Sequence, residues 1–213
     1  MTGVQTCVLP ISHLRGFFVL GDLPELRNFG VMLPGMEVRS LPFPKISPVS
    51  LDGDSNARNP VNDFLFTGVV TTYREDILSA LGKKGFRIEN PKSFLSRKRR
   101  DLMSRNSKVV LNIPQREDWR WLSLMRVISA LRSGRPTVSL GTNDQSQIAA
   151  CCFQIDTRDP DWSARLKERL DTGHELYRTA FSAYCRLASQ FEAKNPFPHS
   201  MFELWAITDR LSY

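Results

Sequence analysis

The sequence predicts an α/β protein built on a doubly wound parallel sheet, with helices on both faces and a helical C-terminal tail. Three observations predict this class. Short apolar runs alternate with segments of helical periodicity from Asp63 onward. Glycines stand where the first helices should end, and the chain after the last run is helical in pattern. Strands separated by helices are joined by right-handed crossovers, which makes them parallel and covers the sheet on both faces.

Five short runs are expected to be strands. Most are apolar and rich in β-branched or aromatic residues, as strands buried on both faces are. The expected strands are 64–70 (FLFTGVV), 86–90 (FRIEN), 107–113 (SKVVLNI), 137–140 (TVSL) and 150–156 (ACCFQID).

Helices are expected between and after these strands. The first has the pattern of a capping box, Thr72 followed by Glu75, and ends at Gly82. The third is apolar on most sides and is therefore expected to be buried. The expected helices run from Thr72 to about residue 81, over 92–105, 119–132 and 162–170, through a long segment that includes 177–191, and over 201–211.

The N-terminal part differs in composition. Residues 13–62 carry many prolines and little periodicity, which indicates loops and short extended pieces, interpreted as part of an upstream domain or a linker. The first twelve residues, MTGVQTCVLPIS, resemble the translation of a sequencing-adaptor oligonucleotide and are set aside as artefactual. On this interpretation the chain is the C-terminal part of a longer protein, and its partners include a missing upstream domain.

The net charge and the composition limit the classes of ligand that the chain is expected to bind. The net charge of +7 and the pI near 9.5 favour anionic ligands. The basic block 97–100 is interpreted as either a solvated helix face or an anion-binding patch. No apolar run is long enough to cross a bilayer, so no membrane span is expected. The four cysteines lack metal-binding or disulfide-framework spacing, which favours a reducing, cytoplasmic setting and no metal site.

Candidate binding residues follow the strands, because doubly wound sheets bind ligands at the carboxyl ends of their strands. Gly68 ends the first strand, where it is either a structural turn or a ligand contact. The helix that begins at Thr72 offers free N–H groups for a phosphate, with Arg74 one turn in. Residues 112–116 and 139–143 are the equivalent positions after later strands. No dinucleotide-binding or P-loop glycine motif and no nucleophile elbow occurs, so catalytic residues are not assigned.

Three segments together resemble a known family. DFLFTGVVTTYREDILSALGKKGF, then SKVVLNI, then LMRVISALRSGRPTVSL are similar in order and spacing to the C-terminal Rossmann-like domain of group 1 glycosyltransferases of the GT-B fold, particularly the bacterial kind. The resemblance covers about residues 63–156. It implies that residues 63–213 form one half of a GT-B fold and bind a nucleotide-sugar as donor substrate, without a separate cofactor. The donor-binding and phosphate-binding residues it implies are Gly68, Arg74, Asn112, Arg126, Ser129, Gly134 and Ser139.

The chain differs from the family at one group of positions, and this difference supports a second hypothesis. Family members commonly carry two glutamates before the turn that matches Gly134, whereas no acidic residue lies between Trp119 and Pro136. The first hypothesis is a glycosyltransferase that moves a sugar from a nucleotide donor to an unknown acceptor. The alternative is a non-catalytic nucleotide-binding or partner-binding module that keeps the Rossmann-like frame. Nucleic-acid binding is the weakest interpretation, because the basic block lacks interleaved aromatic residues.

Overall fold

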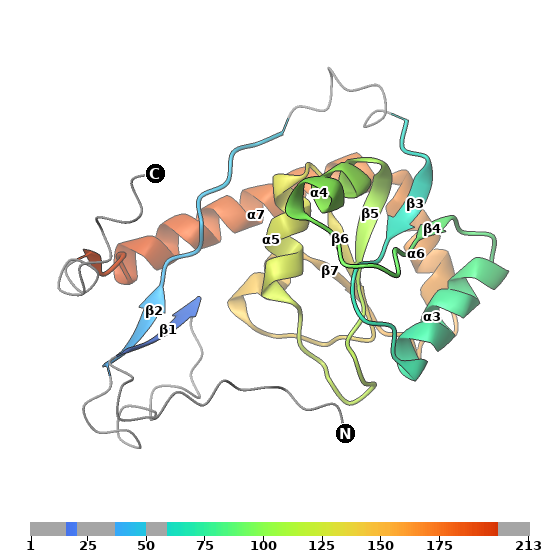
Figure 1. Ribbon diagram of the computed structural model, residues 1–213, viewed down its shortest axis with the longest axis horizontal. Helices are drawn as coiled ribbons and strands as arrows, with labels where there is room; N and C mark the ends of the chain where they lie inside the picture. Colours follow the sequence, from blue (N-terminus) through green and yellow to red (C-terminus); the bar gives the residue numbers. More distant parts are fainter. Residues whose placement is uncertain (1–15, 21–36, 50–58, 200–213) are drawn as a thin grey trace. The chain divides into compact units, whose positions relative to one another are not determined.

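The computed structural model describes residues 16–20, 37–49 and 59–199. The chain forms two compact units, one of residues 1–45 with 188–213 and one of residues 46–187. In the first unit, β1 (Gly16–Leu20) and β2 (Glu37–Leu41) pair in parallel (Figure 1). These are short extended pieces of the kind expected over residues 13–62. The helix expected over 201–211 and the first twelve residues lie outside the described residues.

The second unit contains a five-stranded, entirely parallel sheet, which confirms the predicted α/β class. The strand order is β4-β3-β5-β6-β7. The chain therefore moves from β3 to β4 in one direction and from β5 to β7 in the other, so the direction switches between β3 and β5. The strands are β3 (Asn62–Leu65), β4 (Ile88–Glu89), β5 (Ser107–Asn112), β6 (Thr137–Leu140) and β7 (Phe153–Ile155).

Helices cover both faces of this sheet, again as predicted. Side chains of α3 (Thr72–Lys83) and α6 (Trp162–Asp171) join one face of the strands in a single hydrophobic core, which includes Phe64, Leu111 and Leu140. On the other face, Leu65 and Val110 face α4 (Arg97–Arg105) and α5 (Leu124–Arg132). The long α7 (Gly173–Lys194) follows. Its buried side chains are Tyr177, Ala180, Tyr184, Ala188 and Phe191. In the part of the chain that the structure describes, no helix is both long and apolar enough to cross a membrane.

Several expected boundaries are wrong, and each has a local cause. β3 ends at Leu65 rather than at residue 70, because the chain turns away at Gly68, whose φ is 152°. The predicted strand 150–156 starts only at Phe153, since residues 147–151 form a short 3₁₀ helix. The predicted capping box is also wrong. Thr71 is the N-cap of α3, and its hydroxyl donates 2.8 Å to the Gln115 carbonyl instead of capping the helix.

The helix predicted over 119–132 begins five residues later, at Leu124. Tertiary hydrogen bonds hold the preceding residues outside the helix: the Leu122 N–H donates 2.7 Å to the Asp144 carboxylate, and Arg120 donates 3.0 Å to the Gly141 carbonyl. The predicted burial on most sides is wrong as well, since Trp121 is 68% exposed and Met125 is 64% exposed. Sequence periodicity cannot anticipate such long-range bonds, and here they outweigh helical propensity.

Asp63 ties β3 to both neighbouring strands. Its carboxylate accepts 2.9 Å from the Arg87 N–H and lies 2.9 Å from the Lys108 ammonium. Burial acts to raise the pKa of Asp63, but the bonds from Arg87 and Lys108 outweigh it and lower that pKa below the usual value. The carboxylate therefore contributes stability that is present above its ordinary pKa and is lost as the pH falls through its lowered pKa.

We expect Asp63→Asn to reduce the free energy of unfolding by about 1–3 kcal/mol at pH 7, because a bond to a charged partner is lost. The difference between variant and wild type should begin to shrink below about pH 4, where the carboxylate of the unfolded chain becomes protonated, and should shrink further as the pH falls through the lowered pKa of the native carboxylate. Urea unfolding at pH 7 and at pH 3 checks this. A difference of equal size at both pH values would contradict an electrostatic role for Asp63.

Candidate anion-binding site at the carboxyl edge of the sheet

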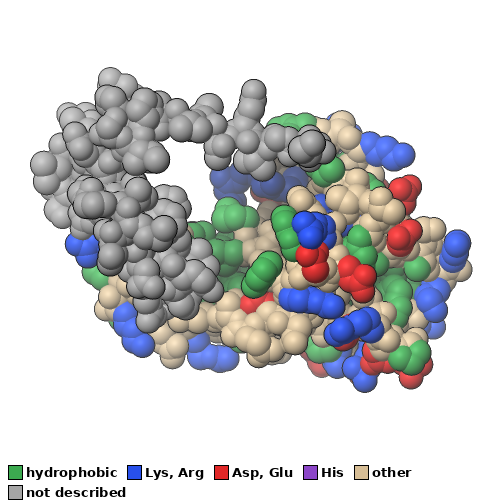
Figure 2. All heavy atoms as spheres, turned by 90° about the horizontal axis from the view of Figure 1, so that it is seen from below, with side chains coloured by type: hydrophobic (Ala, Val, Ile, Leu, Met, Phe, Trp, Pro, Cys, Tyr) green, Lys and Arg blue, Asp and Glu red, His purple; other side chains and the backbone are tan. Residues whose placement is uncertain are grey.

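The candidate site lies where the neighbouring strands β3 and β5 end. This is the point at which the strand order switches direction, and doubly wound sheets open a crevice there. In Figure 1, α3 and α5 both begin at the lower side of the sheet, just beyond the ends of the strands. Figure 2 views the protein from that side and shows basic side chains lying among hydrophobic and acidic ones. Helix N-termini directed at one edge favour an anion there.

Arg126, in the first turn of α5, bridges the ends of the two strands. Its Nη1 donates 2.7 Å to the Asn112 side-chain oxygen, and its Nη2 donates 2.7 Å to the Thr67 carbonyl. Asn112 is itself fixed, since its amide donates 2.7 Å to the Ser139 hydroxyl, to which Thr142 also donates at 2.8 Å. A buried chain of hydrogen bonds thus holds the Arg126 guanidinium in one orientation.

Arg74 makes a different set of contacts. Its Nε and Nη2 donate to the Ile113 carbonyl at 2.9 and 2.7 Å, and its Nη1 donates 2.7 Å to the Val69 carbonyl. The residue is only 6% exposed. Arg74 therefore joins the loop after β3 to the loop after β5, and most of its hydrogen-bonding capacity serves this purpose.

The two arginines carry positive charge that no carboxylate of residues 16–20, 37–49 or 59–199 balances in an ion pair. Both guanidinium carbons lie over Phe66, at 5.3 Å for Arg74 and 5.5 Å for Arg126 from the ring centroid. Neither forms an ion pair within the described part of the chain. Burial lowers the pKa of Arg126 to about 10, with repulsion from Arg74 adding to the effect, and burial also lowers the pKa of Arg74. A bound anion would relieve this cost.

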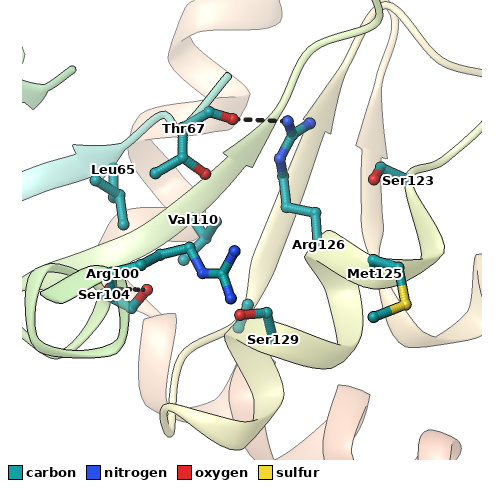
Figure 3. Close-up of a pocket in the computed structure, with 10 residues that line it drawn as sticks. Leu65, Thr67, Arg100, Ser104, Val110, Ser123, Met125, Arg126 and Ser129 are labelled. Atoms are coloured by element: carbon teal, nitrogen blue, oxygen red, sulfur yellow. Dashed lines mark hydrogen bonds between the residues drawn. The ribbon is translucent and has the colours of Figure 1, made fainter. Parts of the chain in front are cut away.

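Three adjoining cavities surround these arginines. The first, about 210 Å³, lies between α4 and α5 (Figure 3), the second is about 370 Å³ and the third about 400 Å³. The cavities share lining residues: Arg126 lines the first two, Gly68 the last two, and Arg100 the first and third. None of their lining residues is acidic. The basic lining residues are Arg74, Lys92, Arg100 and Arg126.

Arg100 is the basic side chain with the most free donors. Figure 3 shows it extending from α4 toward Ser129 of α5, across the first cavity. Its Nε is buried and has no hydrogen-bond partner, and its guanidinium forms no ion pair among the described residues. The remaining members of the 97–100 block are exposed, and Arg97 lies 3.9 Å from Asp101. Arg97 and Lys98 line a different cavity, of about 510 Å³, together with the acidic Asp101, whereas Arg100 faces the first cavity.

Gly68 allows the backbone to approach both arginines. A Cβ atom at this position would lie 3.2 Å from Arg126 Nη2 and 3.5 Å from the Phe66 ring. Its φ of 152° is also one that side chains rarely adopt. The exposed Gly68 backbone therefore borders the second and third cavities without a side chain between it and a ligand.

The structure brings most of the sequence-predicted residues together, but not all. Gly68, Arg74, Asn112, Arg126 and Ser129 line the cavities, whereas Ser139 is fully buried behind Asn112 and acts through it. The prediction for Gly134 needs correction. It precedes β6, at the opposite edge of the sheet, and with φ of 76° its N–H donates 3.1 Å to the Leu131 carbonyl as a helix end.

Trp119 and Trp121 are lining residues that sequence reasoning missed, and Lys92 and Arg100 were considered only as parts of a basic region that either is solvated or binds an anion. The two tryptophans could have been identified from the sequence, because large aromatic residues in the loop that follows a buried strand lie at the ligand-binding edge of such a sheet. They were not recognised as binding candidates because they were assigned to a buried helix.

Comparison with models of known protein families finds no family that matches the chain, and comparison with curated proteins likewise finds no match. The inference of function therefore depends on the geometry and charge of this edge of the sheet.

Proposed function

We propose that the chain is the donor-binding domain of a glycosyltransferase and that it binds the diphosphate of a nucleotide-sugar at the carboxyl edge of β3 and β5. The observation that carries the proposal is the set of three cavities at the switch point, which share lining residues and are lined by four basic side chains and by no acidic one. Phosphate groups are bound by such donors, and the family resemblance of residues 63–156 supports the same ligand class.

The basic residues have separate roles in this proposal. Arg100 offers its free guanidinium to the phosphate oxygens, and Arg126 offers the N–H groups that Asn112 and Thr67 leave unused. Gly68 lets the phosphates approach the backbone closely. Arg74 holds the two loops in place through the Ile113 and Val69 carbonyls. Ser129 adds a hydroxyl at the first cavity.

In the proposed transfer, the bond from the anomeric carbon of the sugar to the diphosphate oxygen breaks, and the oxygen of the acceptor hydroxyl forms the new bond to that carbon while its proton passes to the leaving diphosphate or to solvent. The electron pair of the broken bond stays on the diphosphate. Positively charged donors stabilise this developing charge, and electrostatic stabilisation of this kind usually lowers the activation barrier more than any other effect in an enzyme. Arg100 and Arg126 would supply it.

One observation favours a second candidate function. The cavities contain no carboxylate that could serve as a general base or contact the donor sugar. A domain that binds a nucleotide or a partner without transferring a sugar would need no such group.

Calorimetric titration with UDP, GDP, their sugars and inorganic pyrophosphate tests the proposal. Saturable binding of a nucleoside diphosphate is the expected result. No heat of binding and no shift in melting temperature at millimolar nucleotide would overturn the proposed site. Where the nucleotide-sugar binds, release of free nucleoside diphosphate over time separates a transferase from a binding module.

A further inference from the structure

The loop between β5 and α5 carries two tryptophans at the wall of the second cavity. Trp119 is 41% exposed and Trp121 is 68% exposed. Large aromatic side chains usually bury most of their surface, so two exposed indoles in three residues need an explanation. Both line the cavity of about 370 Å³ that also contains Gly68, Arg74 and Arg126.

This loop is held in place from both sides. The Leu122 N–H donates 2.7 Å to Asp144, whose backbone N–H in turn donates 2.8 Å to the Gln154 side chain. The Asn143 N–H donates 3.1 Å to the Arg120 carbonyl, and the Arg120 side chain donates to the Gly141 carbonyl. The tryptophans therefore stand on a braced backbone, which preorganises them and lowers the entropic cost of binding.

The two indoles differ in their surroundings. Trp119 has the Arg116 guanidinium 5.8 Å from its ring centroid, and Arg116 is held there by Asp118 at 2.7 Å. No ring or cation contact of Trp121 is present among the described residues. Trp121 thus offers the more accessible aromatic surface of the two.

We propose that Trp121, with Trp119 lining the same cavity, is the stacking platform for the planar base of the nucleotide. The inference rests on the proposed function and deepens it. One cavity combines arginine donors suited to phosphate with an exposed indole suited to a planar ring. A nucleoside diphosphate carries both chemical groups, and the cavity volume lies in the range of small-molecule sites. Stacking of a base on an aromatic side chain tolerates different bases, so the platform supplies affinity rather than base selectivity.

The test compares ligands with and without a base. We expect Trp121→Ala to weaken binding of UDP and GDP roughly 5- to 150-fold, and to leave the affinity for inorganic pyrophosphate unchanged. Trp121→Phe, which keeps an aromatic ring, should retain most of the nucleotide affinity. Phe197→Ala is the matched control, since Phe197 is an exposed aromatic residue that does not line these cavities and should change neither affinity.

Isothermal titration of the full chain, with the melting temperature of each variant as a check on folding, distinguishes the outcomes. If wild type binds neither pyrophosphate nor nucleotide, the proposed function fails and this inference falls with it. If wild type binds both but Trp121→Ala binds UDP equally well, the stacking platform alone is overturned. A variant that loses pyrophosphate and nucleotide together would also overturn it, because Trp121 would then act on the anion site.

Discussion

Replacing Arg126 with alanine is expected to weaken nucleoside diphosphate binding roughly 10- to 150-fold, since a hydrogen bond to a charged group contributes about 1.5–3 kcal/mol. Arg126 is the basic residue common to the first two cavities, and Asn112 and Thr67 fix its orientation. Arg100→Ala should weaken binding as well, although by less, because no hydrogen bond holds the Arg100 guanidinium in the described part of the chain, so it loses more side-chain entropy on binding.

The measurement is calorimetric titration with UDP, GDP and pyrophosphate against each variant. Arg99→Ala is the matched control, because Arg99 is the exposed neighbour of Arg100 on α4 and lines none of the cavities. Unchanged affinity in both Arg126→Ala and Arg100→Ala would place the nucleotide elsewhere, whereas equal losses in all three variants would indicate an unspecific effect of net charge.

The affinity for pyrophosphate is expected to depend on pH through the ionisation of Arg126. Its pKa of about 10 in the free protein is low for an arginine because of burial and the nearby Arg74. A bound anion favours the protonated form and raises that pKa. The ratio of wild-type to Arg126→Ala affinity for pyrophosphate should therefore be constant below about pH 9 and fall as the pH rises through 10, because the ionisation of pyrophosphate itself affects both proteins equally.

Replacing Arg74 with methionine is expected to lower the free energy of unfolding by about 3 kcal/mol. The variant keeps most of the buried stem but leaves the carbonyl of the buried Ile113 without its two donors and removes the bond to the Val69 carbonyl, and an unsatisfied buried group costs about 1–3 kcal/mol. In a chain of this size, that loss corresponds to a melting temperature lower by roughly 6–12 °C.

Differential scanning calorimetry of Arg74→Met checks this expectation. Arg178→Met is the matched control, because Arg178 is exposed on α7 and has no hydrogen bond or ion pair among the described residues. A stable Arg74→Met variant that no longer binds pyrophosphate would contradict the bracing role and make Arg74 a direct phosphate ligand.

The predicted class and most of the elements follow from local patterns. The boundaries of β6 are as predicted, because β-branched residues follow a helix stop at Gly134 and Pro136. α3 also forms where helical spacing predicts it and ends near the expected glycines, although the capping box expected at its start is wrong. The start of α5 was not predictable in this way, because Asp144, twenty-two residues from Leu122, competes for its backbone.

The sequence by itself determined that this protein has a parallel sheet whose strands end among basic and polar residues, because periodicity and glycine positions act over a few residues. Only the tertiary structure decided which of those residues remain available to a ligand. Arg74 is bound to a carbonyl 39 residues away and Arg126 to one 59 residues away, while Arg100 keeps its donors free and Trp121 stays exposed. Hydrogen-bond partners distant in the chain consume a side chain's donors, and no local pattern records that competition.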